Sequence, residues 1–340
     1  MPKLESSLPN EVREVAAPDP ARARHFDPRS AIRNLQSTGL VLVLLLLSVA
    51  LTFASPYFLT SRNLLNVLLQ TSINTVLAVG MTFVIITGGI DLSVGSALAL
   101  TAVVMAALAE QGVSVPLVMT AGLLCGAGTG AANGLAIVRM KIPAFIVTLG
   151  TLSIARGLAL VVAGGRTITV EPYALRMWGE GRLLGVPIPT VFALVLVIIG
   201  HVTLTRTVFG RHLLAIGANE KVAWLAGVST GLTRWMAYII SGVMVFLGAL
   251  ISTGRLGSAD PIRGEGYELD AIAAVIIGGT SLKGGRGSVF GTLLGALLIG
   301  VMRNGLTLRD VTDAWQKVII GAVIVTAVFL DRLRNKASGE

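Results

Sequence analysis

The sequence contains few charged residues, few aromatic residues and a single cysteine. Asp, Glu, Lys and Arg make up 13% of the 340 residues, and Phe, Trp and Tyr make up 5%. A soluble domain needs about 25% charged residues, so much of this protein's surface must face something other than water. Because Cys125 is the only cysteine, no disulfide can form within the chain.

Motifs for catalysis and metal binding are also missing from the sequence. It has no Gly-x-x-x-x-Gly-Lys-Ser/Thr loop, so the chain does not hydrolyse ATP by that route. His25, His201 and His212 are the only histidines, and they do not have the spacing of metal ligands. No His-Glu-x-x-His or Gly-x-Ser-x-Gly motif occurs. We therefore expect no catalytic residue, no metal site and no cofactor in this chain.

Apolar residues dominate instead, at 54% of the chain, with a mean hydropathy of +0.80 and 40 glycines. A membrane-spanning helix needs about 20 predominantly apolar residues. Nine segments meet that requirement, and the shorter segment 270–282 is a tenth crossing or half-crossing. The sequence thus predicts an all-α polytopic membrane protein with about ten transmembrane helices. The nine long segments are 39–58, 64–87, 92–109, 115–138, 143–163, 187–205, 235–256, 288–306 and 314–331.

The charges of the connecting loops predict the orientation in the membrane. Lys and Arg outnumber acids in 206–234, whereas acids dominate 257–270, which places the first loop in the cytoplasm and the second outside. An even number of spans then puts both termini in the cytoplasm, so the net charge of +9 anchors the chain and does not indicate a nucleic-acid partner. The predicted units are a disordered tail 1–37, a membrane domain 38–332 with the loop 206–234, and a C-terminal tail 333–340.

Two apolar stretches are broken by glycines and polar residues, each after a Val-Ile-Ile run. Irregular backbone inside a membrane is tolerated only where protein or a wet cavity satisfies its amides, and paired breaks indicate a transport path. The alternative is that both breaks are cytoplasmic turns. Their similarity is also compatible with an internal repeat. The candidate path residues in the breaks are Gly88, Gly89, Asp91, Ser93, Gly278, Gly279 and Thr280.

Glycines recur at every fourth residue in two of the predicted spans. A stripe of glycines lets another backbone approach closely, so these positions predict tight helix packing, either within the chain or between chains. A nucleotide-binding loop is excluded because no strand precedes the glycines. The packing positions are Gly122, Gly126, Gly130 and Gly134 in one span and Gly287, Gly291 and Gly295 in the other.

Four charged residues fall in or beside the predicted spans: Asp91, Arg156, Glu268 and Asp270. A charge at the centre of a lipid-facing helix costs about 2.5–3.5 kcal/mol, so each side chain should face protein or water. Arg156 either forms an ion pair, with Asp91 or with an acid of an outer loop, or contacts a substrate. All four are candidate path residues.

A short helix is predicted within the basic loop, over 219–226. Asn219 is a good N-cap residue, Glu220 suits the first helical turn, and Gly227 ends the helix. An amphipathic helix on a cytoplasmic face indicates a docking partner; the alternative is a helix lying on the membrane surface.

Three stretches, in this order and spacing, carry a resemblance to a known family. They are Gly89-Ile90-Asp91-Leu92-Ser93-Val94-Gly95-Ser96, the loop Gly217-x-Asn219-x-x-x-Ala223-x-x-x-Gly227, and Gly266-Tyr267-Glu268-Leu269-Asp270-Ala271-Ile272-Ala273-Ala274-Val275 with its continuation Gly278-Gly279-Thr280-Ser281-Leu282 and Gly291-Thr292.

Over about 60–335 the sequence resembles the permease subunits of ribose-type monosaccharide ABC importers. The resemblance implies a type II-like permease fold in a bacterial inner membrane, paired with a second permease copy. It also implies two ATPase subunits that bind ATP and Mg²⁺, and an extracytoplasmic sugar-binding protein that docks around 165–186 and 257–268. The sequence departs from the family pattern at Ala218, Val222 and Trp224. The residues implied to couple the chain to the ATPase are Gly217, Asn219, Glu220, Ala223, Trp224 and Gly227.

Three rival functions remain open from the sequence. A branched-chain amino-acid permease would share this architecture and carry a different substrate. An ion-coupled secondary transporter would work without ATPase subunits. A membrane enzyme is disfavoured because no nucleophile and base are paired.

Overall fold

The computed structural model describes residues 28–337 and is almost entirely helical. Each of the ten predicted segments overlaps a helix. The helices are α2 (Pro28–Ala54), α3 (Ser61–Ile86), α4 (Val94–Glu110), α5 (Val115–Arg139), α6 (Ala144–Ala163), α7 (Tyr173–Glu180), α8 (Ile188–Arg206), α9 (Val208–Ala218), α10 (Glu220–Leu225), α11 (Thr230–Leu256), α12 (Tyr267–Ile277), α13 (Val289–Thr307) and α14 (Asp313–Ala337), and the short strands are β1 (Ile168–Thr169), β2 (Arg182–Leu183), β3 (Val186–Pro187) and β4 (Ser258–Ala259).

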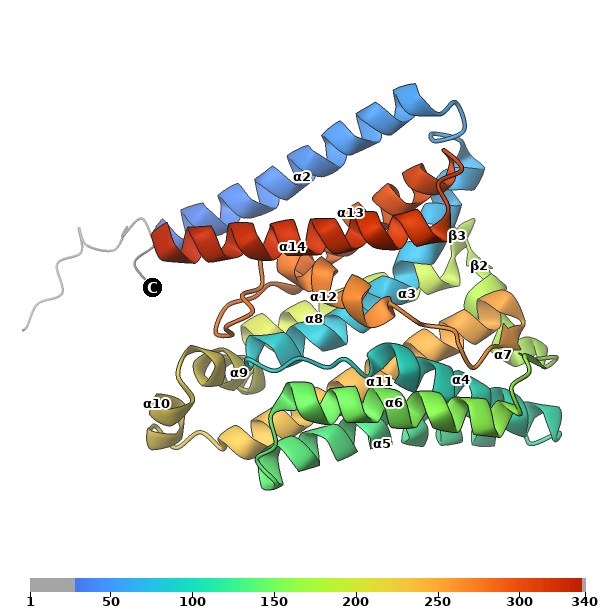
Figure 1. Ribbon diagram of the computed structural model, residues 1–340, viewed down its shortest axis with the longest axis horizontal. Coiled ribbons are helices and arrows are strands. Elements are labelled where there is room, and N and C mark those ends of the chain that lie inside the picture. Colours follow the sequence, from blue (N-terminus) through green and yellow to red (C-terminus); the bar gives the residue numbers. More distant parts are fainter. Residues whose placement is uncertain (1–27, 338–340) are drawn as a thin grey trace, which may run out of the picture.

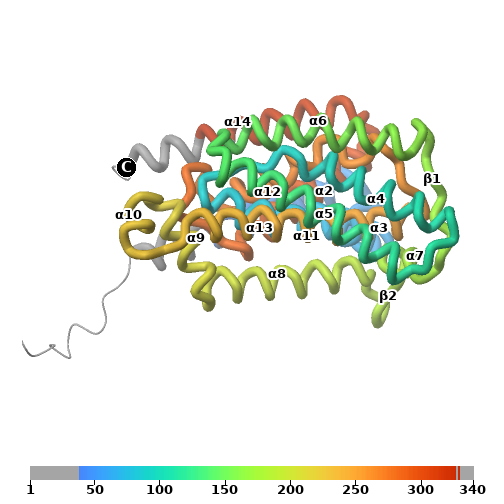
Figure 2. The backbone as a smooth tube through the Cα atoms, turned by 90° about the horizontal axis from the view of Figure 1, so that it is seen from below, coloured from blue at the N-terminus to red at the C-terminus, as the bar shows by residue number. Residues whose placement is uncertain are grey.

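The long helices run roughly along one direction and give the molecule two distinct ends (Figure 1). One end carries α9, α10 and the C-terminus, and the other carries α7 and the strands (Figure 2). The loops predicted to be cytoplasmic therefore gather at one end, and those predicted to be outside gather at the other.

Six helices are long and apolar enough to cross a membrane: α3, α5, α6, α8, α11 and α13. Helix α4 has 17 residues and α12 has 11, so both are shorter than an ordinary crossing. The chain is thus a polytopic helical protein, while the count of ten spans and the orientation of the termini stay predictions.

Helices α2 and α14 extend into the two predicted tails within the described residues. Helix α2 begins at Pro28, so residues 28–37 of the predicted disordered tail are helical. Proline suits the first helical position because its missing N–H has no partner there. Helix α14 reaches Ala337, well into the predicted tail 333–340. Residues 1–27 and 338–340 lie outside the described part.

Helices α3 and α11 form the centre of the bundle. Most residues in the apolar window of α3 are buried, whereas few are buried in α6, at 83% and 17% respectively. A helix that is apolar on all sides belongs inside a bundle, and α3 indeed packs against α8, α11, α12 and α13. The more exposed α6 lies at the edge of the fold (Figure 1).

The glycine stripe of α5 lies against α11 of the same chain. A Cβ at Gly126 would come within 3.0 Å of the Phe246 amide nitrogen, and one at Gly130 would overlap the Tyr238 carbonyl oxygen. Gly134 likewise meets Trp235 of α11, whereas a Cβ at Gly122 would first meet the Met105 side chain of α4 and then the Phe246 ring. The close approach therefore joins two helices within one chain.

Replacing Gly130 with alanine is expected to destabilise the protein by about 1–3 kcal/mol, because the added methyl must push α5 and α11 apart. Gly128 is the matched control, because it lies on another face of the same helix with open space around it. Gly128→Ala should be neutral or slightly stabilising. Thermal unfolding of both variants in detergent checks this; equal midpoints would contradict the packing role.

The second glycine stripe is shorter than predicted. Gly291 and Gly295 lie on α13 and face Gly278 and Ala274 of α12. Gly287 instead precedes the helix, because Ser288 is the N-cap and accepts a hydrogen bond from the Gly291 amide at 3.1 Å. The predicted span 288–306 begins at this N-cap residue, so Gly287 lies outside both the predicted span and the observed helix.

Candidate functional site

The first break, between α3 and α4, is held by a buried polar network around Asp91. The Asp91 carboxylate accepts hydrogen bonds from the Ser93 amide at 3.0 Å and from the Ser93 hydroxyl at 2.6 Å. Ser241 of α11 donates to its other oxygen at 3.2 Å. Asn133 of α5 donates to the Ser93 hydroxyl at 2.9 Å. Side chains from two other helices thus hold the polar side chains of this break in place.

Gly88 and Gly89 lie at the start of the same break. Gly88 has a φ of 78°, the left-handed conformation that ends α3. Gly89 packs against the Tyr238 hydroxyl, where a Cβ would be only 2.5 Å from the oxygen. Among the described residues, that buried hydroxyl has no hydrogen-bond partner. The break therefore tolerates no larger side chain at position 89.

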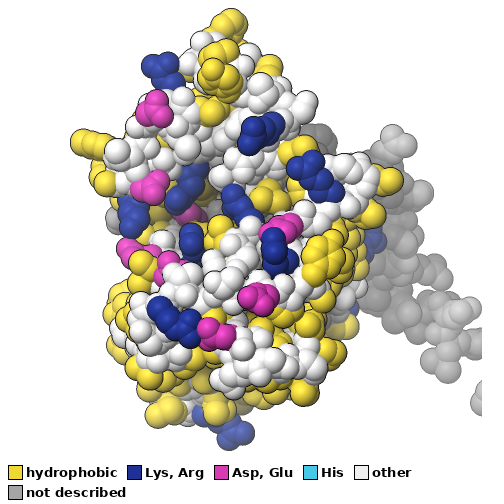
Figure 3. Space-filling model, turned by 90° about the vertical axis from the view of Figure 1, so that its right-hand side faces the viewer, with side chains coloured by type: hydrophobic (Ala, Val, Ile, Leu, Met, Phe, Trp, Pro, Cys, Tyr) yellow, Lys and Arg dark blue, Asp and Glu magenta, His cyan; other side chains and the backbone are white. Residues whose placement is uncertain are grey.

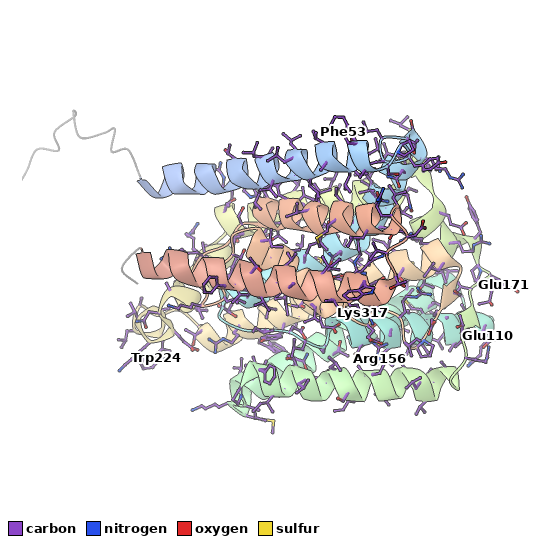
Figure 4. The ribbon with its side chains drawn as sticks, turned by 45° about the horizontal axis from the view of Figure 1, so that its top comes forward. Phe53, Glu110, Arg156, Glu171, Trp224 and Lys317 are labelled. Carbon is purple, nitrogen blue, oxygen red and sulfur yellow. The ribbon has the colours of Figure 1, made fainter. Side chains whose placement is uncertain are left out.

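Arg156 does not pair with Asp91, which was one of the predicted alternatives. Its guanidinium donates to the backbone carbonyls of Pro261 at 2.6 Å and Arg263 at 3.0 Å. Among the nearby acids, Glu268 exerts the strongest attraction on its charge. Arg156 thus connects α6 to the loop before α12. Figure 4 shows Arg156 between the two ends of the molecule.

Asp270 and Glu268 lie in the first turn of α12 but have different partners. Asp270 is buried and accepts two hydrogen bonds from Arg303 of α13, at 2.9 and 2.7 Å. Glu268 accepts the Gly266 amide at 3.2 Å. In the loop before α12, Glu265 accepts a hydrogen bond from Lys317 of α14 at 3.1 Å, which holds the pKa of that carboxyl below its usual value. Asp270 is therefore a structural anchor between α12 and α13.

The second break follows α12 and closes against the first. Gly279 has a φ of 88°, in the same left-handed region as Gly88 at the end of α3, whose φ is 78°. Thr280 is buried, and its hydroxyl accepts a hydrogen bond from the Ser288 amide at 3.4 Å. The Gly285 amide donates to the Ile86 carbonyl at 2.9 Å. The two breaks are therefore neighbours in space.

The predicted docking helix is present as α10. Asn219 is its N-cap and accepts the Val222 amide at 3.1 Å, while Gly227 ends it with a φ of 84°. Ala223 is 4% exposed and packs inward, whereas Trp224 is 64% exposed and Leu225 68%. Figure 4 shows Trp224 at the opposite end of the molecule from Glu110 and Glu171.

One further contact holds α10 in place. Glu220 forms an ion pair with Arg234 of α11 at 2.9 Å. Gly217, two residues before the N-cap, is packed under the second break. The outward surface of α10 therefore combines the apolar side chains of Val222, Trp224 and Leu225 with the exposed Lys221, while Ala223 faces the bundle.

The far end of the molecule joins two loops that are distant in sequence. Strands β1 and β4 pair antiparallel, with Ile168 opposite Ala259. Strands β2 and β3 form a hairpin whose turn residues Leu184 and Gly185 both have positive φ, which matches a right-twisted two-residue turn. Figure 3 shows this end, where basic and acidic side chains alternate over the surface.

A half-open cavity of about 660 Å³ lies at this end. Arg62, Arg182 and Arg255 give its lining a positive charge that the single acid Glu180 only partly offsets, and Asn63 and Asn66 add neutral amide groups. Sequence reasoning missed this cavity and also the anchors Asn133, Ser241 and Arg303. The sequence signal for the cavity was the placement of Arg62 and Arg255 at the ends of two predicted spans. Among the described residues, no group of three His, Cys, Asp or Glu side chains could hold a metal ion.

These features define a polytopic helical membrane protein with two broken segments and a short helix, α10, that exposes Trp224 and Leu225, an arrangement typical of transport proteins. A family model described as "Branched-chain amino acid transport system / permease component" matches residues 63–328. The chain belongs to this permease family, which confirms the resemblance found in the sequence. It is accordingly a multi-pass membrane protein.

Curated relatives match nearly the whole chain. The ribose import permease protein RbsC of Bacillus subtilis is 45% identical over 92% of this chain and 96% of its own length. RbsC of Escherichia coli K12 is 40% identical over 88% and 95%. The galactose/methyl galactoside import permease protein MglC of E. coli K12 is 36% identical over 91% and 98%. No solved structure matches the chain.

Proposed function

We propose that this chain is the membrane-spanning permease subunit of an ATP-binding cassette importer for a simple, ribose-like sugar. The observation that carries the proposal is the 45% identity to a ribose import permease over almost the full length of both chains. Separate ATPase subunits bind ATP and Mg²⁺, and a second permease copy completes the path. The importer sits in the bacterial inner membrane.

The choice of sugar over amino acid follows from the individual relatives. The family description names branched-chain amino acids, but the similar permeases are named for ribose, D-allose and galactose. A branched-chain amino-acid substrate is therefore not favoured. An ion-coupled transporter is disfavoured as well, because the ABC-importer permeases that the sequence resembles work with separate ATPase subunits.

The two ends of the molecule suit two different partners. At one end, the exposed apolar residues of α10 offer a surface to the ATPase. At the other, pairing of β1 with β4 joins the segments 165–186 and 257–268 into one surface, where a sugar-binding protein would dock. The arginine-lined cavity beside it favours acidic side chains of that protein. Closure of the ATPase pair would then rock the permeases and open the path to one side at a time.

Uptake of radiolabelled D-ribose into liposomes tests the proposal. The importer is purified from its native host through a tag on this chain and reconstituted with ATP inside and the binding protein outside. We expect ribose to accumulate only when ATP and the binding protein are both present. Unlabelled D-allose and D-galactose serve as competitors, with leucine as the amino-acid control.

The same liposomes with this chain alone provide the decisive comparison. Accumulation driven by a proton or sodium gradient, without ATPase subunits, would support a secondary transporter instead. Competition by leucine and not by any sugar would move the substrate to the amino-acid class.

A further inference from the structure

The backbone of three distant segments meets at one point beneath α10. The segments are the end of α3, the end of α9 and the loop of the second break. We call this point the glycine junction and define it by Ile86, Gly88, Gly217, Gly284 and Gly285. Its members come from positions up to about 200 residues apart, so only the folded chain brings them together.

The contacts of the junction leave no room for side chains. A Cβ at Gly217 would overlap both the Ile86 carbonyl oxygen and the Gly285 amide nitrogen. A Cβ at Gly284 would lie 2.8 Å from the Ile86 oxygen and 2.9 Å from the Gly88 nitrogen. A hydrogen bond from the Gly285 amide to the Ile86 carbonyl closes the arrangement at 2.9 Å.

The junction lies directly between α10 and the two breaks. Ala218 touches Gly285, and only Asn219 separates Ala218 from the first residue of α10. On the other side, Gly88 begins the first break, and Gly284 and Gly285 belong to the second. Backbone packed this tightly transmits a displacement instead of absorbing it, because packed interiors have low compressibility.

We propose that the glycine junction makes α10 and the two breaks move as one rigid unit, so that ATPase-driven movement of α10 reaches both breaks through Gly217 and Gly285. This inference rests on the proposed function, because it needs an ATPase that moves α10. It assigns Gly217, Gly284 and Gly285 as positioning residues, which act on the path through the segments they hold.

Gly217→Ala is the sharpest variant. Gly217 lies within α9 and has helical backbone, so alanine suits its conformation and only the junction contacts are disturbed. In the complete importer, we expect D-ribose uptake per ATP hydrolysed to fall about tenfold or more, while ATPase activity and complex assembly persist. Gly231→Ala is the matched control at the same end, because its Cβ would meet only a valine side chain.

The ratio of uptake to hydrolysis separates coupling from plain destabilisation, which lowers both quantities together. A ratio for Gly217→Ala within about twofold of the Gly231→Ala ratio would overturn the junction's role. If the wild-type importer shows no ATP-dependent ribose uptake, the proposed function fails instead, so the two failures are distinguishable.

A distance measurement covers the case in which Gly217→Ala does not fold. Spin labels at Ala218→Cys and Lys283→Cys, in a Cys125→Ser background, occupy exposed positions on either side of the junction. We expect their separation to be the same in the nucleotide-free and ATP-bound importer. The control pair Ala218→Cys and Arg139→Cys should change its separation. A changed distance across the junction, or an unchanged control pair, would refute the rigid unit.

Discussion

Replacing Trp224 with alanine is expected to weaken binding of the ATPase subunits by about 30-fold or more. Its side chain is 64% exposed on α10. A large apolar residue at an exposed position contributes little to the stability of the chain itself. Tryptophan residues that fill a partner's pocket commonly contribute 2 kcal/mol or more to binding, which corresponds to about 30-fold. Titration of the purified permease in detergent with its ATPase subunits measures the change.

Leu184→Ala is the matched control for Trp224→Ala. Leu184 is a fully exposed apolar residue, at 99%, but it lies in the hairpin turn at the opposite end. Its loss should leave ATPase binding unchanged. Equal affinities of the Trp224 variant and the wild type would show that α10 lies on the membrane surface, which was the alternative that the sequence left open.

Ala223 is the wrong position for this test, although the sequence places it on the apolar side of the helix. It is buried against the bundle at 4% exposure. A bulky charged residue there would displace α10 from the permease itself, so lost coupling would not report on docking. Trp224 and Leu225 carry the outward surface instead.

Asp270→Ala is expected to lower the free energy of unfolding by about 3 kcal/mol. The substitution removes both hydrogen bonds to Arg303 and leaves that guanidinium without its carboxylate. Breaking a buried ion pair from one side costs about 3–5 kcal/mol, and the lower value applies because the Arg303 side chain is 35% exposed. The thermal unfolding midpoint in detergent reports the loss.

The double variant Asp270→Leu with Arg303→Met completes this test. It removes both charges and keeps similar volume, so it should recover much of the lost stability. A double-mutant cycle then isolates the energy of the pair. If Asp270→Ala alone unfolds at the wild-type midpoint, the pair is not the anchor between α12 and α13.

Local features of the fold were predictable from the sequence. Apolar runs located every long helix, and capping residues located α10 to within a residue at each end, because hydropathy and caps act over a few neighbouring positions. The predicted span 288–306 likewise agrees with α13 to within a residue at each end. The motifs around Asp91, Asn219 and Tyr267 were enough to indicate the family.

Contacts between distant segments were not predictable in the same way. The sequence predicted an ion pair of Arg156 with Asp91 or with an acid of an outer loop. The hydrogen bonds of its guanidinium go instead to the backbone carbonyls of Pro261 and Arg263. The path of the loop between β4 and α12 decides which carbonyls come within reach of Arg156, and no local pattern encodes that path.

The sequence by itself determined that this chain is a multi-pass membrane permease, and it predicted the two broken segments and a short helix over 219–226. Those properties follow from hydropathy, charge and short motifs along the chain. Only the tertiary structure decided that the glycines of α5 meet α11, that Ala223 faces inward, and that Gly217 lies beneath both breaks. Each of these depends on how closely two backbones approach, which is set by the packing of the whole bundle.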